Sequence, residues 1–117
     1  MLTIDEGDDD RLDLVYAALA NRRRRQVVLT LSVRPASIAQ LASQQGSSLP
    51  AFHRHVVALE EAGLVERRKS GRVTFLALTR SGLVAAQGWL GQFHSYWGNA
   101  GETLENYVAG IDQGDSQ

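Results

Sequence analysis

Polar and cationic side chains recur on one face of a segment that has the features of a capped helix, residues 48–62. Ser48 is a suitable N-cap, and Pro50 falls in the first turn, where its missing amide hydrogen costs nothing. Gly63 is a suitable C-terminal stop. An apolar stripe at helical spacing is formed by Phe52, Val56 and Leu59. The other side carries small, polar or cationic residues, namely Ser48, Ala51, His53, Arg54 and Ala58. Such groups near a helix N-terminus can read base edges in the major groove of DNA.

The residues after this helix indicate a β-hairpin with a cationic tip. Residues 64–69 and 73–78 are rich in β-forming side chains, and the Ser70-Gly71 step between them suits a tight turn. The cations that cluster near this tip are Arg67, Arg68, Lys69 and Arg72. They suit contact with DNA phosphates, and cations on an exposed strand also serve solubility.

A shorter helix is predicted immediately before the first one, over residues 38–45. Ser37 is its expected N-cap and Gly46 its expected stop. Two helices joined by about three residues, with glycine in the turn, match a helix-turn-helix. We therefore predict contacts with double-stranded DNA from both helices and the hairpin. The predicted DNA-binding residues are Ser37, Gln40, Ser47, Ser48, Pro50, Ala51, His53, Arg54, Arg67, Arg68, Lys69 and Arg72.

Individual side chains in this set have different expected roles. Arg54 suits a bidentate contact with guanine, and Pro50 and Ala51 suit contact with a thymine methyl group. A histidine at the DNA face, His53, suggests binding that strengthens as the pH falls.

The distribution of charge agrees with a polyanionic partner. The net charge is −1, but residues 20–80 hold eleven Lys or Arg and three acids. The acids concentrate at the two ends of the chain. A basic middle between acidic ends is typical of a nucleic-acid-binding segment, whereas solvated surface charge is the alternative reading.

Helices are also predicted on both sides of this region, over residues 10–19, 22–31 and about 80–97. Asn21 is the expected cap of the second one. The arginines at residues 22–25 point in directions about 100° apart and cannot form one patch. We expect most of them to be solvated or to pair with carboxylates, with one or two touching phosphates. Glycines at 82, 88 and 91 inside the last helix would be explained by close approach of another helix.

The chain reads as one domain, residues 10–109, between a disordered acidic tail at 1–9 and a C-terminal tail at 110–117. It contains no cysteine, which excludes disulfides and thiolate metal sites. No apolar run reaches the roughly 18 residues of a membrane span. We expect a cytoplasmic protein without a membrane partner. No motif of an enzyme active site is present, so an enzyme is not expected.

In this order of elements and in several short motifs, the chain resembles the ArsR family of bacterial winged-helix repressors. The resemblance covers about residues 12–108. The matching segments are LANRRRR at 19–25, SIAQLA at 37–42, SLPAFHRH at 48–55, LEEAGLV at 59–65, GRV at 71–73, and the tryptophans Trp89 and Trp97 of the last helix. The tryptophans and the lack of cysteine resemble the autorepressor-like branch. Phe52 and His53 stand where the family usually has valine and serine, which alters the expected base preference at His53.

The resemblance implies a mainly α-helical fold with a small β-hairpin, a winged helix-turn-helix that is dimeric through its first and last helices. It also implies a homodimer that represses transcription from an inverted-repeat operator. The expected dimerisation residues are Leu12, Val15, Tyr16, Leu83, Ala86, Trp89, Leu90, Phe93, Tyr96 and Trp97. Metal-sensing members carry cysteines in the third helix or Asp/His pairs in the last. Neither pattern is present here, so we expect no metal site and no cofactor.

Two other functions stay open at this point. The aromatic stripe of Trp89, Phe93, Tyr96 and Trp97 could line a pocket for a small apolar ligand that releases the protein from DNA, although its spacing favours a dimer core. Alternatively, the winged helix could be a protein-interaction module. In that case the helix and the hairpin would be expected to lose the positive charge that they keep here.

Overall fold

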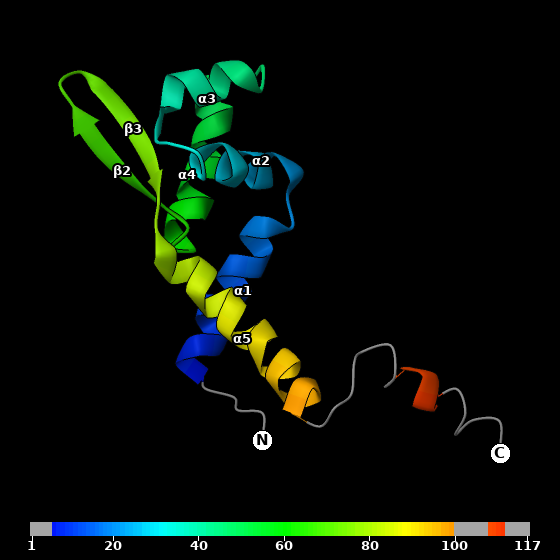
Figure 1. Cartoon of the computed structure of the whole chain (residues 1–117). Coiled ribbons are helices and arrows are strands. Elements are labelled where there is room, and N and C mark those ends of the chain that lie inside the picture. Colours follow the sequence, from blue (N-terminus) through cyan, green and yellow to red (C-terminus); the bar gives the residue numbers. More distant parts are fainter. Residues whose placement is uncertain (1–5, 100–107, 112–117) are drawn as a thin grey trace. The chain divides into compact units, whose positions relative to one another are not determined.

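The structure is a computed structural model that describes the backbone of residues 6–99 and 108–111 (Figure 1). Side chains are described for residues 9–93 and 108–111. The chain divides into two compact units, one from Ile4 to Ala86 and one that contains Gln87 and the residues after it. The first unit holds the first four helices, all the described strands and the start of the last helix.

The order of elements agrees with the predicted one, with differences at some ends. The elements are α1 (Glu6–Leu19), α2 (Arg22–Leu31), β1 (Ala36–Ser37), α3 (Ile38–Gln44), α4 (Leu49–Glu61), β2 (Val65–Ser70), β3 (Val73–Leu78) and α5 (Arg80–Asn99). α1 begins four residues before the expected start at Asp10, so residues 6–9 are helical and do not belong to a disordered tail. Residues 108–111 are also helical, whereas the rest of the helix expected at 102–109 lies outside the described residues.

Side-chain caps begin three helices at the residues that the sequence indicates. Asn21 Oδ1 accepts hydrogen bonds from the amides of Arg23 (2.9 Å) and Arg24 (3.2 Å) at the start of α2. At the start of α3, Ser37 Oγ accepts from the Gln40 amide at 3.0 Å. Caps at the starts of α3 and α4 fix where the helix-turn-helix begins and where its second helix begins.

The hairpin belongs to a three-stranded antiparallel sheet with strand order β1-β3-β2. The sequence did not predict β1, in which Ala36 lies opposite Leu76 and Ser37 lies opposite Phe75. A two-residue strand carries no period-2 pattern, and only its pairing with β3 defines it. Because β1 leads directly into α3, this pairing ties the helix-turn-helix to the base of the hairpin.

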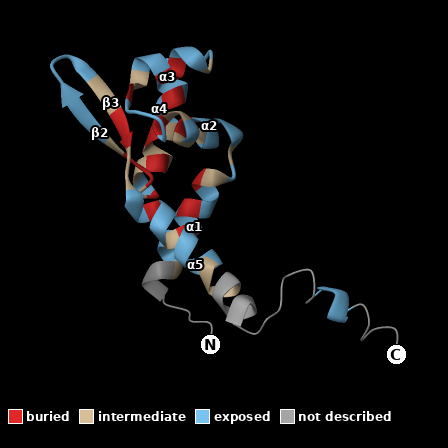
Figure 2. Cartoon of the chain, in the orientation of Figure 1, coloured by how far each residue is buried: buried red, intermediate tan, exposed pale blue. Residues whose placement is uncertain are grey.

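The core is built around α4, which packs against α1, α2, α3 and β2 (Figure 2). The predicted apolar stripe of α4 is confirmed, since Phe52, Val56 and Leu59 are completely buried. Other fully buried side chains of the core come from the elements around this helix, namely Val15, Val27, Leu64 and Leu76. Burial of a single large apolar side chain contributes about 1.5–3 kcal/mol, so this stripe fixes which face of α4 remains outside.

The end of α4 is joined to the start of α5 by one carbonyl group. Gly63, at φ +70°, adopts the left-handed conformation that glycine tolerates. Its carbonyl oxygen accepts hydrogen bonds from the hydroxyl groups of Thr79 and Ser81 and from the Gly82 amide, the last at 2.9 Å. A Cβ atom on Gly82 would lie 2.6 Å from the carbonyl oxygen of Ala62. The close approach predicted for this glycine is therefore confirmed at position 82, where the end of α4 meets the start of α5.

Among the helices that the structure describes, none combines the length and the apolar character that crossing a membrane requires.

Candidate nucleic-acid interface

The outer face of α4 carries the residues predicted to read bases. Pro50, Ala51, His53 and Arg54 are exposed, whereas Phe52 between them is fully buried. Ser48 is also exposed, and its hydroxyl accepts from the Ala51 amide at 3.3 Å as the N-cap of the helix. One helix face is thus anchored in the core, and the opposite face presents a hydroxyl, an imidazole and a guanidinium group.

The predicted residues outside α4 are arranged differently from one another. Gln40 is exposed on α3. Ser37 and Ser47 are half-buried, and both hydroxyl groups already make hydrogen bonds within the chain. The Ser47 hydroxyl donates to the Ser48 carbonyl oxygen at 3.1 Å. A structural role for these two serines is therefore visible in the chain itself.

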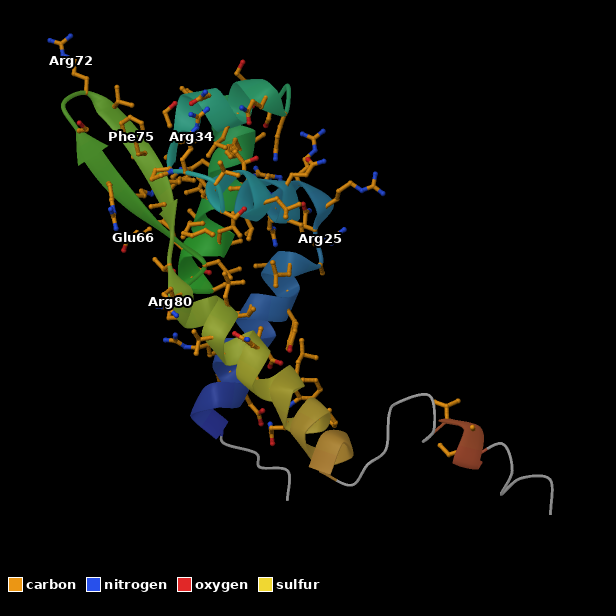
Figure 3. All side chains as sticks on the ribbon, in the orientation of Figure 1. Arg25, Arg34, Glu66, Arg72, Phe75 and Arg80 are labelled. Atoms are coloured by element: carbon orange, nitrogen blue, oxygen red, sulfur yellow. The ribbon has the colours of Figure 1, made fainter. Side chains whose placement is uncertain are left out.

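The four cations of the hairpin fall into two pairs. Arg67 Nε donates to Glu60 Oε1 at 2.9 Å, and Arg68 Nε donates to Glu66 Oε1 at 2.8 Å. Neither carboxylate partner was predicted, and Glu60 belongs to α4, not to the hairpin. The other pair, Lys69 and Arg72, makes no ion pair or hydrogen bond with any residue that the structure describes. In Figure 3 the Arg72 side chain projects outward at the hairpin tip.

The exposed groups gather toward one end of the 4–86 unit. In Figure 1 the hairpin tip and α3 lie toward the end at which α4 begins, whereas α5 begins near the other end of α4. Arg54, on the outer face of α4, makes no ion pair or hydrogen bond with another described residue. The start of a helix, with its partial positive charge, and free cations therefore share one end of this unit.

The arginines at residues 22–25 have a structural role that the sequence did not reveal. Three of them donate to main-chain carbonyl groups at or near the C-terminal ends of α1 and α3, and none of these three forms a carboxylate ion pair within the described part of the chain. Helix C-termini leave carbonyl oxygens without partners and attract cations. The bonds join Arg23 Nη1 to Gln45 O (3.4 Å), Arg24 Nη1 to Ala17 O (3.4 Å) and Arg25 Nη1 to Leu19 O (2.7 Å). The expected pairing with carboxylates is wrong for these three.

His55 connects α4 to α2 behind the exposed face. Its Nδ1 accepts a hydrogen bond from Arg24 Nε at 3.2 Å, and its ring makes an edge contact with Phe52. Burial lowers the pKa of His55, and the positive charges of Arg24 and Arg23 lower it further. A neutral imidazole suits this position because it can accept from a guanidinium group, which only donates.

The residues expected at a dimer surface are divided by the structure. Leu12, Val15 and Ala86 are buried within the single chain, so they support α1 and α5 and offer no surface to a partner. Exposed apolar surface remains on both helices at Tyr16, Leu83, Trp89 and Leu90. Phe93 is half-buried and makes an edge-to-face contact with Trp89, with ring centroids 4.8 Å apart. The side chains of Tyr96 and Trp97 lie outside the described residues, so the aromatic stripe stays a prediction both as a dimer surface and as a ligand pocket.

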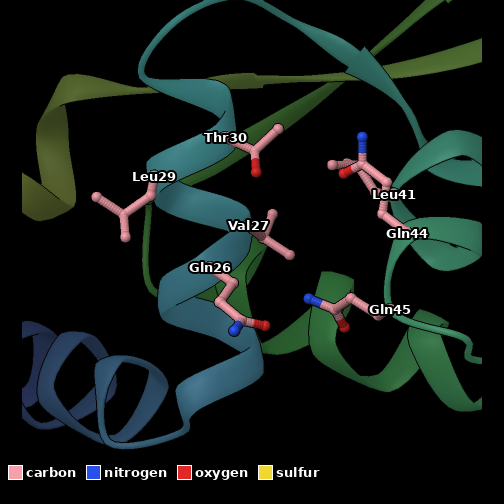
Figure 4. A pocket seen from close by; sticks show the side chains of 7 residues that line it. All are labelled: Gln26, Val27, Leu29, Thr30, Leu41, Gln44 and Gln45. Carbon is pink, nitrogen blue, oxygen red and sulfur yellow. The ribbon is translucent and has the colours of Figure 1, made fainter.

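A pocket of about 400 Å³ lies between α2 and α3, away from the exposed face of α4 (Figure 4). Gln45 at its edge donates from Nε2 to the Arg23 carbonyl oxygen at 2.9 Å, while its Oε1 is buried without a hydrogen-bond partner among the described residues. The residues that line the pocket are uncharged: Gln26, Val27, Leu29, Thr30, Leu41, Gln44 and Gln45. No predicted DNA-binding residue lines it.

Comparison with known proteins places this geometry in a family. A family model described as a helix-turn-helix domain matches residues 19–68, which include α2, α3 and α4. The HTH-type transcriptional regulator KmtR of Mycobacterium tuberculosis is 36% identical over 77 residues, which is 63% of this chain and 59% of that relative. The chain thus matches less than two thirds of the length of this curated relative.

Two solved structures show the same fold over most of their length. The crystal structure of an ArsR family transcriptional regulator is 31% identical, with a TM-score of 0.71 over 83% of this chain and 96% of that one. The homodimeric winged helix-turn-helix DNA-binding domain of a possible ArsR-family regulator from Mycobacterium bovis is 26% identical, with a TM-score of 0.60 over 81% and 90% of the two chains. The predicted fold class is confirmed by the shared architecture. Because the 31% identity extends over nearly the whole of the first of these structures, the chain belongs to the ArsR family of winged-helix transcriptional regulators.

Proposed function

We propose that this protein binds double-stranded DNA sequence-specifically as a homodimer on an inverted-repeat operator and represses transcription there. The observation that carries the proposal is the exposed face of α4, which begins at the same end of the 4–86 unit as the cationic hairpin tip. The major groove admits a helix of this size, and the N-terminal residues of a recognition helix contact the base edges.

In this proposal α4 reads the sequence and the hairpin grips the backbone. Arg54 donates to guanine, and Ala51 and Pro50 contact a thymine methyl group. Lys69 and Arg72 contact phosphates, which fix the register of the protein but carry no sequence information. Their lack of carboxylate partners among the described residues leaves both charges available for this contact.

The dimeric state is supported by exposed apolar side chains on α1 and α5. Tyr16, Leu83, Trp89 and Leu90 each expose more than a third of their surface, and covering this surface with a second copy would remove it from water. The Mycobacterium bovis relative is a homodimer. A two-fold dimer presents two copies of α4 to half-sites about 34–36 Å apart, one turn of DNA.

The free cations favour DNA over a protein partner for this surface. A winged helix that had become a protein-interaction module would have no need for exposed, unpaired cations on both α4 and the hairpin tip. We also propose that the protein does not sense metals through cysteines, because the sequence has none. An intracellular location, in the cytoplasm, follows from a DNA partner.

Selection of bound duplexes from a random library tests the proposal, followed by measurement of affinity for the selected duplex from 50 to 200 mM salt. If a dimer makes about 6–10 phosphate contacts, the affinity is expected to fall by roughly 10³–10⁵ over this range. Selected sequences are expected to contain two inverted half-sites. Recovery of no preferred sequence, or an affinity that does not change with salt, would refute the proposal.

A further inference from the structure

One side chain links the recognition helix to the hairpin. Arg67, the third residue of β2, lies next to two residues of α4. Its Nε donates to Glu60 Oε1 at 2.9 Å, and its Nη2 lies 3.4 Å from His53 Nδ1. His53 and Glu60 are seven residues apart, about two helical turns, so they share one face of α4. Arg67 therefore contacts the same helix face that is proposed to read DNA.

The chemistry of this contact determines the state of the histidine. A guanidinium group has only N–H donors and cannot accept a hydrogen bond. His53 Nδ1 must therefore be the acceptor, which requires a neutral ring whose single proton is on Nε2. The ion pair with Glu60 orients the guanidinium group that makes this contact. The His53 side chain itself is exposed.

We propose that Glu60 and Arg67 fix the tautomer of His53, so that His53 offers an Nε2–H donor to DNA and selects a base with an acceptor in the major groove. This inference rests on the proposed DNA-binding function and specifies the chemistry of one contact. Guanine, adenine and thymine all present a major-groove acceptor, whereas cytosine presents only its N4 amino donor. The contacted position of each half-site therefore excludes cytosine. Arg67 acts here as a positioning residue, because it sets the proton of the side chain that reads the base.

Release of this constraint has a defined consequence. Without Arg67, the ring can move its proton to Nδ1 and offer Nε2 as an acceptor, which suits the cytosine amino group. A bidentate base contact discriminates by about 1–3 kcal/mol, and a single N–H contact lies at or below the lower end of that range. We therefore expect roughly three- to tenfold discrimination against cytosine in the wild type, reduced to less than about twofold when Arg67 is replaced.

The test uses Arg67→Met with Arg68→Met as its matched control. Both changes remove one guanidinium group from β2 and disrupt one carboxylate ion pair, but only Arg67 contacts His53. Nitrogen-15 NMR of the imidazole groups in the free full-length protein, at about pH 8 where an ordinary histidine is neutral, reports the tautomer without DNA. The wild type and Arg68→Met are expected to show a protonated Nε2 and an unprotonated Nδ1. Arg67→Met is expected to show a mixture, and a spectrum identical to the wild type would overturn the proposal.

Selection of duplexes with the same three proteins tests the reading role. His53→Ala identifies the position at which the preference depends on this side chain. The wild type and Arg68→Met are expected to exclude cytosine there, and Arg67→Met is expected to accept it. Equal base preference in Arg67→Met and Arg68→Met would overturn the reading role. If none of the proteins prefers any duplex, the proposed function fails and the reading role fails with it, while the NMR result still decides whether Arg67 sets the tautomer.

Discussion

Replacement of Gly82 by alanine tests the junction that fixes the hairpin between α4 and α5. A Cβ atom at this position would lie 2.6 Å from the Ala62 carbonyl oxygen, 2.9 Å from the Gly63 carbonyl oxygen and 3.0 Å from a methyl group of Leu64. Two of these three atoms belong to the backbone and cannot rotate away. The Gly63 oxygen also accepts the Gly82 amide at 2.9 Å, so moving it weakens that hydrogen bond.

The size of the effect follows from three terms. Overpacking costs about 1–3 kcal/mol, and a weakened hydrogen bond costs up to about 1 kcal/mol. Alanine returns up to about 1 kcal/mol through its better helix propensity, less so in the first turn, where position 82 lies. Gly82→Ala is therefore expected to lower the free energy of unfolding by about 1–3 kcal/mol.

Urea denaturation at one fixed protein concentration measures this change, since the stability of a dimer depends on concentration. Gly88→Ala, in the same helix, is the control because no described atom lies within 4 Å of a Cβ at that position. The control is expected to gain up to about 1 kcal/mol. A Gly82→Ala protein as stable as the wild type would refute the close approach at this junction.

Three further predictions concern the hairpin, the recognition helix and the helix behind it. Replacing Lys69 and Arg72 together by glutamine is expected to reduce the slope of log affinity against log salt by about 0.9 for each phosphate that the protein no longer neutralises, and an unchanged slope would exclude them from the backbone. Ser48→Ala is expected to cost about 1 kcal/mol of unfolding free energy through loss of the cap, whereas Ser47→Ala should change it by less than about 0.5. Burial and the nearby arginines lower the pKa of His55, so its contribution to stability is present above pH 6.5 and is lost as the pH falls through the lower, folded-state value. His55→Gln should therefore weaken the decline of stability below pH 6.5, and an unaltered pH profile of denaturation would contradict this origin.

The sequence predicted the elements whose patterns are local. The recognition helix repeats its apolar residues every three or four positions and begins with Ser48, so both its boundaries and its buried face could be predicted. The glycine at position 82 indicated a close approach before the neighbouring atoms were known. Such features depend on a few adjacent residues, and the physical chemistry of caps, periodicity and glycine acts at that range.

The sequence could not predict contacts that depend on how distant elements pack. The partners of Arg67 lie seven and fourteen residues earlier in the chain, and nothing in the hairpin sequence distinguishes this arginine from Arg68. One local signal was available, namely that His53 and Glu60 share a helix face. The pairing of Arg25 with the Leu19 carbonyl likewise depends on the turn between α1 and α2. Donors that bind main-chain carbonyl groups have no sequence signature, because every residue carries such an acceptor.

Photo-crosslinking from α4 to DNA tests the central claim most directly. A benzophenone amino acid is placed either at Ala51, exposed in the first turn, or at Glu61, exposed at the C-terminal end of the same helix about 15 Å away. Each protein is irradiated with the selected duplex. If the start of α4 enters the major groove, crosslinks are expected from position 51 to bases in each half-site and not from position 61. Crosslinks from position 61 alone, or from neither position to a duplex that the protein demonstrably binds, would contradict the account.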